Sequence, residues 1–139
     1  MEMIATLSKV NFWAVILAGF SYLIVGALWY SPLLFGKQWM KLNGFTDEDF
    51  KSKKPMWMIT LVSFLSAVVA SFAISLIMGE HSNGPFGAII GACIAVFFIS
   101  MSKLMKVLFE NQPLRLFFIH AGFDIVAYMM LGAIVGYWR

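Results

Sequence analysis

Charged residues are scarce in this chain of 139 residues: Asp, Glu, Lys and Arg make up 12% of it, against about 25% in soluble globular domains. Hydrophobic residues make up 61%, against about 45–50% in such domains. This composition excludes an ordinary water-soluble fold. The chain also has a single cysteine, Cys93, so an intrachain disulfide is excluded, and we expect Cys93 to be a small packing residue.

The motifs of several familiar chemistries are missing as well. There is no glycine-rich phosphate loop, no cysteine pair and no group of residues with metal-ligand spacing, so we predict no metal site and no cofactor. No arginine-rich groove with interleaved aromatic residues points to a nucleic-acid partner. The ten methionines are spread over several faces, which favours lipid-facing or gap-filling roles over a copper site.

Four long apolar runs make up most of the chain and predict spans at about 10–30, 56–78, 84–109 and 114–138. At about 1.5 Å rise per residue, about 20 residues cross the roughly 30 Å of bilayer hydrocarbon. The first run is too long for a signal peptide and lacks small residues at its end, so we expect it to stay attached. The fold class predicted is an all-α integral membrane four-helix bundle, with residues 1–139 forming one transmembrane domain.

Basic residues are unevenly divided between the two ends of such a bundle. Both termini and the 79–83 turn lie at one end, which carries only Lys9 and Arg139. The other end carries eight basic residues: Lys37, Lys41, Lys51, Lys53, Lys54, Lys103, Lys106 and Arg115. The positive-inside rule therefore predicts that the eight-residue side is cytoplasmic and that both termini are outside.

The connection at about 32–54 is long for a loop between spans and is predicted to contain an amphipathic helix on the membrane surface. Pro32 could be the first residue of this helix, and Asn43 and Gly44 could end it. Thr46 and Asp49 then have the spacing of a capping box for a second short helix up to residue 54. The lysines here could attract anionic lipids or ligands, but a solvated topology signal is the favoured interpretation. The residues assigned to this membrane-surface helix are Trp29, Tyr30, Pro32, Phe35, Lys37, Trp39 and Lys41.

The segment from Ala27 to Met40, which contains Trp-Tyr-Ser-Pro at 29–32, is followed by Asn-Gly-Phe-Thr at 43–46. Together with the opening Asn11 and Trp13 and a fourth span bearing His, Gly, Phe and Asp at 120–124, it resembles an uncharacterised family of small four-span bacterial membrane proteins. That family is domain of unknown function number seventeen sixty-one. The resemblance implies the fold and a location in a membrane, and it brings no activity, substrate or site. We expect the membrane to be the cytoplasmic membrane of a bacterium.

Small residues recur at four-residue spacing on three of the predicted spans, a pattern that lets helix backbones approach closely in lipid. These stripes could form a homo-oligomer interface, or they could all pack within the bundle, which is the favoured alternative. The residues concerned are Ser63, Ala67, Ser71 and Ser75, then Gly87 and Gly91 with Ala95, and finally Gly132 and Gly136.

The most informative feature is a polar face on the fourth span, where His120, Asp124 and Tyr128 follow one another at four-residue spacing. Such residues share one side of a helix. If spans three and four form an antiparallel hairpin, Lys103 lies at a level between His120 and Asp124 and can pair with the carboxylate. Ionisable residues at this depth usually have a function and a partner.

Three interpretations of this cluster remain open: a protonation or binding site, an ion pair that fixes helix register, or a face at a subunit interface. The leading hypothesis is proton-linked binding or transport of a small solute or ion. Asp124 would titrate or coordinate, His120 would relay protons, Lys103 would be the counter-ion and Tyr128 a hydrogen-bond donor. The alternatives are an accessory membrane subunit and, third, an enzyme acting on lipid or quinone. Glu80 and His81 could capture a metal or a proton, although a solvated loop is favoured.

Overall fold

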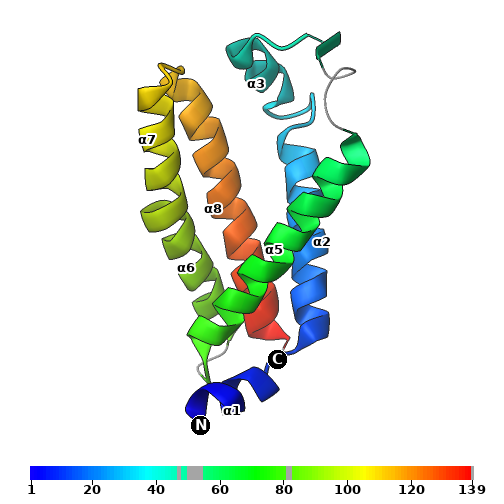
Figure 1. Cartoon of the computed structure of the whole chain (residues 1–139), viewed down its shortest axis with the longest axis vertical. Helices are drawn as coiled ribbons and strands as arrows, with labels where there is room; N and C mark the ends of the chain where they lie inside the picture. Colours follow the sequence, from blue (N-terminus) through cyan, green and yellow to red (C-terminus); the bar gives the residue numbers. More distant parts are fainter. Residues whose placement is uncertain (47, 50–54, 81–82, 139) are drawn as a thin grey trace.

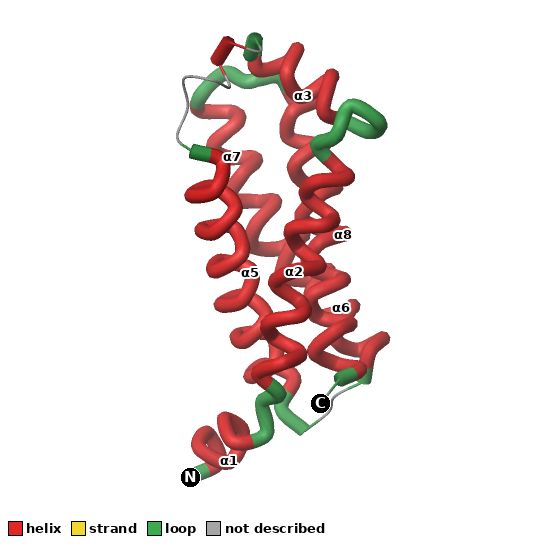
Figure 2. The backbone as a smooth tube through the Cα atoms, turned by 90° about the vertical axis from the view of Figure 1, so that its right-hand side faces the viewer, coloured by secondary structure: helices red, strands yellow, loops and turns green. Residues whose placement is uncertain are grey.

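The computed structural model describes residues 1–46, 48–49, 55–80 and 83–138, and its regular structure there is helical. The chain has four long helical segments. They run side by side with alternating direction (Figures 1 and 2). The predicted all-α four-helix bundle is thereby confirmed. Its elements are α1 (Glu2–Ser8), α2 (Phe12–Trp29), α3 (Gly36–Asn43), α5 (Met56–Met78), α6 (Gly84–Ile94), the π-helix η1 (Ala95–Ser100), α7 (Met101–Phe109) and α8 (Leu114–Tyr137).

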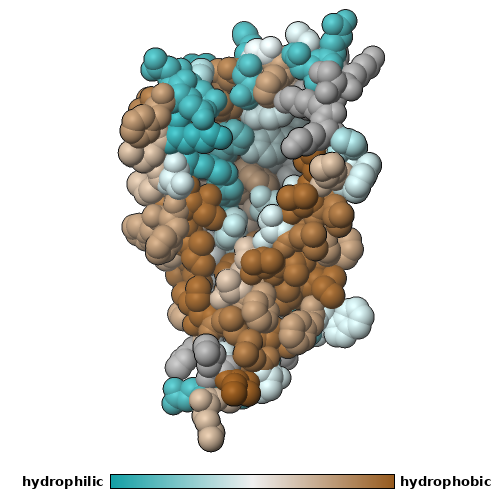
Figure 3. Space-filling view, in the orientation of Figure 1, coloured by the Kyte–Doolittle hydropathy of each residue, from teal (hydrophilic) through white to brown (hydrophobic). Residues whose placement is uncertain are grey.

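The four long segments have the length and apolar composition needed to cross a membrane: Phe12–Trp29, Met56–Met78, Gly84–Phe109 and Leu114–Tyr137. Large apolar side chains cover their outer surfaces, as at Phe20, Val69 and Phe118, which are 52%, 68% and 67% exposed. Brown, hydrophobic atoms dominate the lower part of the face in Figure 3, and hydrophilic atoms gather at its upper end. Because this apolar surface is favourable in lipid and costly in water, the chain is a multi-pass membrane protein.

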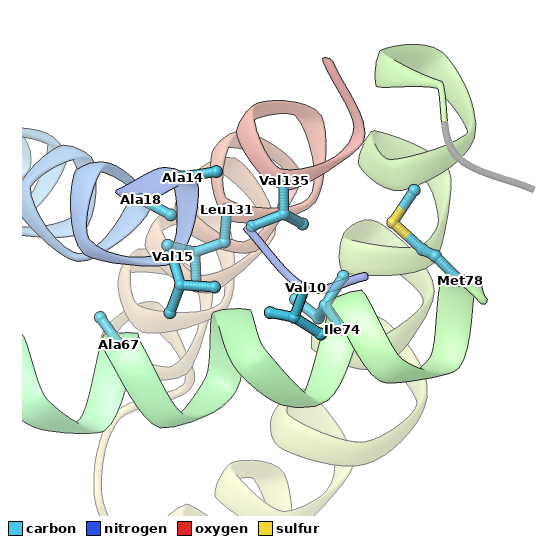
Figure 4. Packing of buried hydrophobic residues seen from close by; sticks show 9 residues of the cluster. All are labelled: Val10, Ala14, Val15, Ala18, Ala67, Ile74, Met78, Leu131 and Val135. Atoms are coloured by element: carbon cyan, nitrogen blue, oxygen red, sulfur yellow. The ribbon is translucent and has the colours of Figure 1, made fainter. Parts of the chain in front are cut away.

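Both termini lie at one end of the bundle, which we call the terminal end (Figure 1). Helix α3 lies at the opposite end, which we call the α3 end. The main apolar core is close to the terminal end and joins α2, α5 and α8 (Figure 4). Its buried members are mostly small or branched: Val10, Ala14, Val15, Ala18, Ala67, Ile74, Met78, Leu131 and Val135. Small side chains at these positions let the helices pack closely, which is how helices associate within lipid.

Local signals in the sequence account for several helix boundaries. The Asn11 side chain accepts hydrogen bonds from the backbone N–H groups of Trp13 and Ala14 and thereby caps α2. Asn83 caps α6 in the same way through the N–H of Phe86. At the other end of a helix, Gly44 ends α3 with φ +68°, a left-handed conformation that glycine adopts without strain.

The surface helix begins later than the sequence pattern predicts. Pro32 does not start it, because residues 31–35 form turns and α3 begins at Gly36. Those turns bring the chain back on itself, with the N–H groups of Phe35 and Gly36 bonded to the carbonyl oxygens of Trp29 and Ser31. A Cβ on Gly36 would lie 2.3 Å from the Tyr30 carbonyl oxygen, so the turn requires glycine at this position.

Two further elements were not expected from the sequence. Helix α1 precedes the first span, and the π-helix η1 interrupts the third. The capping interaction expected at Thr46 is present, because its backbone N–H donates to Asp49 Oδ2 at 2.7 Å. The remainder of the second short helix, at 50–54, lies outside the described residues, as do Lys51, Lys53 and Lys54.

Candidate functional site

The polar face of the fourth span belongs to α8. Asp124 is buried, with 2% of its surface exposed, and His120 is partly buried one turn closer to the α3 end. Tyr128 lies one turn on the other side of Asp124, packed against the apolar core. Because α8 is the most centrally packed of the long helices, a carboxylate on this face is removed from both lipid and water.

Helix α7 supplies the counter-ion for this carboxylate. Lys103 Nζ lies 2.5 Å from Asp124 Oδ2, so the lysine donates a charge-assisted hydrogen bond. The lysine side chain is 38% exposed and the aspartate side chain 3%. The pair therefore has one accessible member and one buried member, and each charge is compensated at a depth where an unpaired charge is expensive.

Helix α2 reaches the same face of α8 through Tyr30, the residue that follows its last turn. The Tyr30 hydroxyl lies 2.7 Å from His120 Nδ1. Burial raises the pKa of the Tyr30 phenol, and the nearby Asp124 carboxylate adds to the increase, so the phenol keeps its proton. The hydroxyl can donate to an unprotonated Nδ1, or accept from a protonated Nδ1 and donate elsewhere.

An aromatic group surrounds this hydrogen bond. The Tyr30 ring contacts Phe123 of α8 and Trp39 of α3, with centroid distances of 5.3 and 5.6 Å. Tyr22, two turns earlier on α2, packs edge-on against Phe123 at 5.2 Å. The aromatic rings hold α2, α3 and α8 together at the α3 end and fix the orientation of the Tyr30 hydroxyl toward α8.

A cleft of about 750 Å³ opens beside these rings, between α2, α3, α5 and α8. The upper part of the molecule is visibly hollowed in Figure 3, between the α7–α8 side and α5. None of the described lining residues is charged: they are Tyr22, Leu23, Gly26, Ala27, Tyr30, Trp39, Met40, Met56, Ile59, Thr60, Ser63 and Phe123. Tyr30 is thus both a wall of the cleft and the hydrogen-bond partner of His120.

This cleft was missed in the sequence because its walls come from four separate segments. One local signal is present in retrospect: Tyr22, Gly26 and Tyr30 follow one another at four-residue spacing and all line the cleft. Glycine between two tyrosines on one side of a helix leaves space that larger side chains would fill. The sequence alone predicts Tyr30 at the membrane surface and indicates no role for Tyr22.

The other residues assigned to the surface helix have varied positions. Trp29 donates from Nε1 to the Ile119 carbonyl oxygen at 3.0 Å, which joins α2 to α8, and its ring packs against Phe35 at a tilt. Pro32 is exposed in the turn before α3, and Lys37 and Lys41 are exposed on α3. The aromatic members therefore contribute to packing inside the bundle, while the lysines lie on its surface.

The small-residue stripes are occupied by helix packing within the chain. On α5, Ala67, Ser71 and Ser75 are buried, whereas Ser63 lines the cleft. Gly87 and Gly91 of α6 lie against the backbone of α8 at Gly132 and Tyr128. A Cβ on Gly136 would lie 2.3 Å from the Asn83 carbonyl oxygen.

At the terminal end, Lys9 and Glu80 form an exposed ion pair. His81, which was considered together with Glu80 as a metal or proton site, lies outside the described residues. Among the described part of the chain, no three His, Cys, Asp or Glu side chains are grouped so that they could hold a metal ion. Cys93 is exposed on α6 rather than packed inside, because its side of the helix faces away from α8.

Comparison with protein families identifies the class of this chain. Residues 13–136 match the family described as "Protein of unknown function (DUF1761)". Since the match covers most of the chain, the protein belongs to this family of uncharacterised proteins. Neither the curated proteins nor the solved structures include a match to it.

Proposed function

We propose that this protein binds or transports a small solute in a manner linked to proton movement, with the cleft as the solute site. One observation carries the proposal: Tyr30 lines the cleft, and its hydroxyl is hydrogen-bonded to His120 Nδ1. A proton or a hydrogen bond can therefore pass between a bound solute and the imidazole through the phenol.

The remaining roles follow from the same geometry. Asp124 is the buried carboxylate that titrates or coordinates, one helical turn from His120, and Lys103 is its counter-ion. Tyr128, one turn farther along α8, extends the polar face toward the apolar core. Protonation of Asp124 would release Lys103, whose side chain is partly exposed and free to reorient. The pair would then have two states, bonded and released. Proton binding to Asp124 could shift the balance between these states and so change the neighbouring cleft.

The placement in the membrane is part of this proposal. The charge bias argues for a cytoplasmic membrane, with the α3 end in the cytoplasm and both termini outside. The cleft would then open near the cytoplasmic surface, where Trp39 and Met40 of α3 form part of its wall. Four helices enclose little volume, so we expect a transport cycle to require a homo-oligomer.

The test is difference infrared spectroscopy of the purified protein in lipid between about pH 9 and about pH 5, comparing wild type with Asp124→Asn. The proposal requires a protonated-carboxyl band that grows as the pH falls and that is missing in Asp124→Asn. Glu110→Gln is the matched control, because Glu110 is exposed at the end of α7. An Asp124 that stays ionised throughout this range would rule out the proton-linked mechanism.

A second candidate is an accessory membrane subunit in which the polar face has only a structural role. The burial of Asp124 and its short contact with Lys103 favour it, because a locked ion pair also satisfies both charges. It predicts that Asp124→Asn weakens folding or assembly and produces no change in proton uptake. The infrared comparison, combined with a measurement of thermal unfolding, separates the two candidates.

A further inference from the structure

We propose that the cleft binds an uncharged aromatic lipophile that carries a carbonyl or hydroxyl oxygen at one end. This inference rests on the proposed function, because it names the ligand class of the same site. The volume of about 750 Å³ is in the range of small-molecule sites, about 300–1,000 Å³.

The charge of the lining decides against ions. None of the described lining residues is charged, and the nearby cation Lys103 is already paired with Asp124. Against the described walls, a charged ligand would lose its hydration without gaining a counter-ion, which is a large cost. An uncharged ligand does not meet this cost.

The shape and chemistry of the walls favour a flat ring. Four aromatic residues line the cleft, namely Tyr22, Tyr30, Trp39 and Phe123, together with one methionine side chain on α3 and one on α5. Aromatic rings and thioethers pack well against a planar ring system. Their positions are fixed by mutual contacts with centroid distances of 5.2–5.6 Å, so the site is largely formed before a ligand arrives.

One end of the cleft recognises an oxygen atom. The Tyr30 hydroxyl can accept a hydrogen bond from His120 Nδ1–H and donate its own proton to a carbonyl or hydroxyl oxygen of the ligand. The cleft follows α2 from Tyr22 to Tyr30, which are eight positions apart, a rise of about 12 Å at 1.5 Å per residue. That length fits a bicyclic ring system whose oxygen lies at Tyr30 and whose apolar end points into the membrane.

We expect a ligand to enter from the bilayer as well as from the α3 end of the cleft. Met56 and Ile59, which line the cleft on α5, are 66% and 44% exposed. Their exposed surface gives the cleft an apolar edge on the α5 side, which is favourable in lipid. A lipophile dissolved in the bilayer can therefore reach the cleft without crossing water.

The experiment is equilibrium dialysis of four probes against nanodiscs that contain the full chain, with empty nanodiscs to subtract partition into lipid. The probes are 1-acetonaphthone, naphthalene, the anion 1-naphthoate and the cation tetraphenylphosphonium. We expect saturable binding of 1-acetonaphthone, weaker binding of naphthalene, and no saturable binding of the two ions. Tighter binding of either ion would overturn the proposal.

Variants locate the probe. Ala27→Phe places a ring in the cleft and should weaken 1-acetonaphthone binding at least tenfold, whereas Ala73→Phe, at an exposed position of α5 away from the cleft, should leave it unchanged. Tyr30→Phe should weaken 1-acetonaphthone about 3- to 10-fold, the effect of one hydrogen bond, and leave naphthalene unchanged. Binding that survives Ala27→Phe, or an equal effect of Tyr30→Phe on both probes, would contradict the assignment.

The ligand class and the proton linkage can fail independently of each other. Probe binding together with an Asp124 that never titrates retains the ligand class and removes the proton linkage. Titration of Asp124 without saturable binding of 1-acetonaphthone retains the proton linkage and removes the ligand class.

Discussion

Gly87 of α6 and Gly132 of α8 lie so close that each blocks a side chain on the other. A Cβ added to Gly87 would be 1.9 Å from the Gly132 carbonyl oxygen, and one added to Gly132 would be 1.8 Å from that of Gly87. The same closeness recurs at Gly91, where a Cβ would be 1.9 Å from the Tyr128 carbonyl oxygen. Backbone contact along this seam holds α8, and with it the polar face, against α6.

We therefore expect Gly132→Ala to lower the free energy of unfolding by about 1–3 kcal/mol, because the added methyl group forces two backbones apart. Gly26→Ala is the control: its Cβ would meet Phe123 at 3.6 Å, an ordinary contact. Unfolding by sodium dodecyl sulfate titration from mixed micelles measures both variants. Equal stability of the two would mean that the helices separate without cost at Gly132.

The Lys103–Asp124 pair predicts strong coupling between two substitutions. Asp124→Asn leaves the partly exposed Lys103 without its partner, and Lys103→Met leaves the buried Asp124 carboxylate without one, whereas the double variant leaves neither charge. Each single substitution should lower the free energy of unfolding. We expect the decrease in the double variant to be smaller than the sum of the two single decreases by at least about 1 kcal/mol.

Lys106→Met provides the control for this cycle, because Lys106 is exposed on α7. Combined with Asp124→Asn, it should give additive changes in unfolding free energy. Additivity in the Lys103 cycle as well would show that the observed contact contributes nothing to stability.

Trp29 should matter more than a tryptophan at the lipid surface. Trp29→Phe removes the hydrogen bond from Nε1 to the Ile119 carbonyl oxygen, and we expect it to cost about 1 kcal/mol in unfolding free energy. Trp57→Phe is matched in chemistry, but Trp57 is 67% exposed and should change stability little. Thermal unfolding compares the two variants. If Trp57→Phe lowered stability more than Trp29→Phe, Trp29 would act only as a membrane anchor.

The Ser100 hydroxyl is buried and has no hydrogen-bond partner within the described part of the chain. Ser100→Ala removes a desolvated polar group, so we expect a gain of about 1 kcal/mol. Ser71→Ala serves for comparison, because its hydroxyl donates to the Ala67 carbonyl oxygen at 2.7 Å and should not yield the same gain. A loss of stability in Ser100→Ala would reveal a partner such as a bound water.

The proposed orientation can be measured by labelling single cysteines in a Cys93→Ser background. Ser8 and Lys41 are exposed at opposite ends of the bundle. A membrane-impermeant maleimide added to intact cells should label Ser8→Cys and leave Lys41→Cys unlabelled until the cells are opened. Labelling of Lys41→Cys in intact cells would show that the α3 end is outside, the opposite of the proposed orientation.

Much of the fold could be predicted because lipid imposes it locally. A run of about 20 apolar residues must be helical, since its backbone groups can bond only to each other in hydrocarbon. The boundaries of α2, α5 and α8 follow from such runs and from the Asn and Pro residues beside them. The start of α3 could not be predicted, because Pro32 favours a helix start and a tight turn equally well, and the contacts around Gly36 decide for the turn.

The candidate site also has parts that could be predicted from the sequence and parts that could not. The spacing of His120 and Asp124, together with a short hairpin connection, was sufficient to suggest Lys103 as a neighbour. Tyr30 was assigned to the membrane surface, because nothing near it in the sequence indicates a partner 90 residues away. The π-helix also escaped prediction, since the apolar run through residues 95–100 reads as ordinary helix.

By itself, the sequence determined the number of spans, the helical class and a polar face on the last helix, because each depends on the composition or spacing of neighbouring residues. Only the tertiary structure decided which side chains meet: the Tyr30–His120 hydrogen bond, the glycine seam between α6 and α8, and the uncharged cleft between α2, α3, α5 and α8. These depend on how helices distant in the chain pack against one another. Such packing is set by the shapes of whole surfaces, which no local pattern of residues contains.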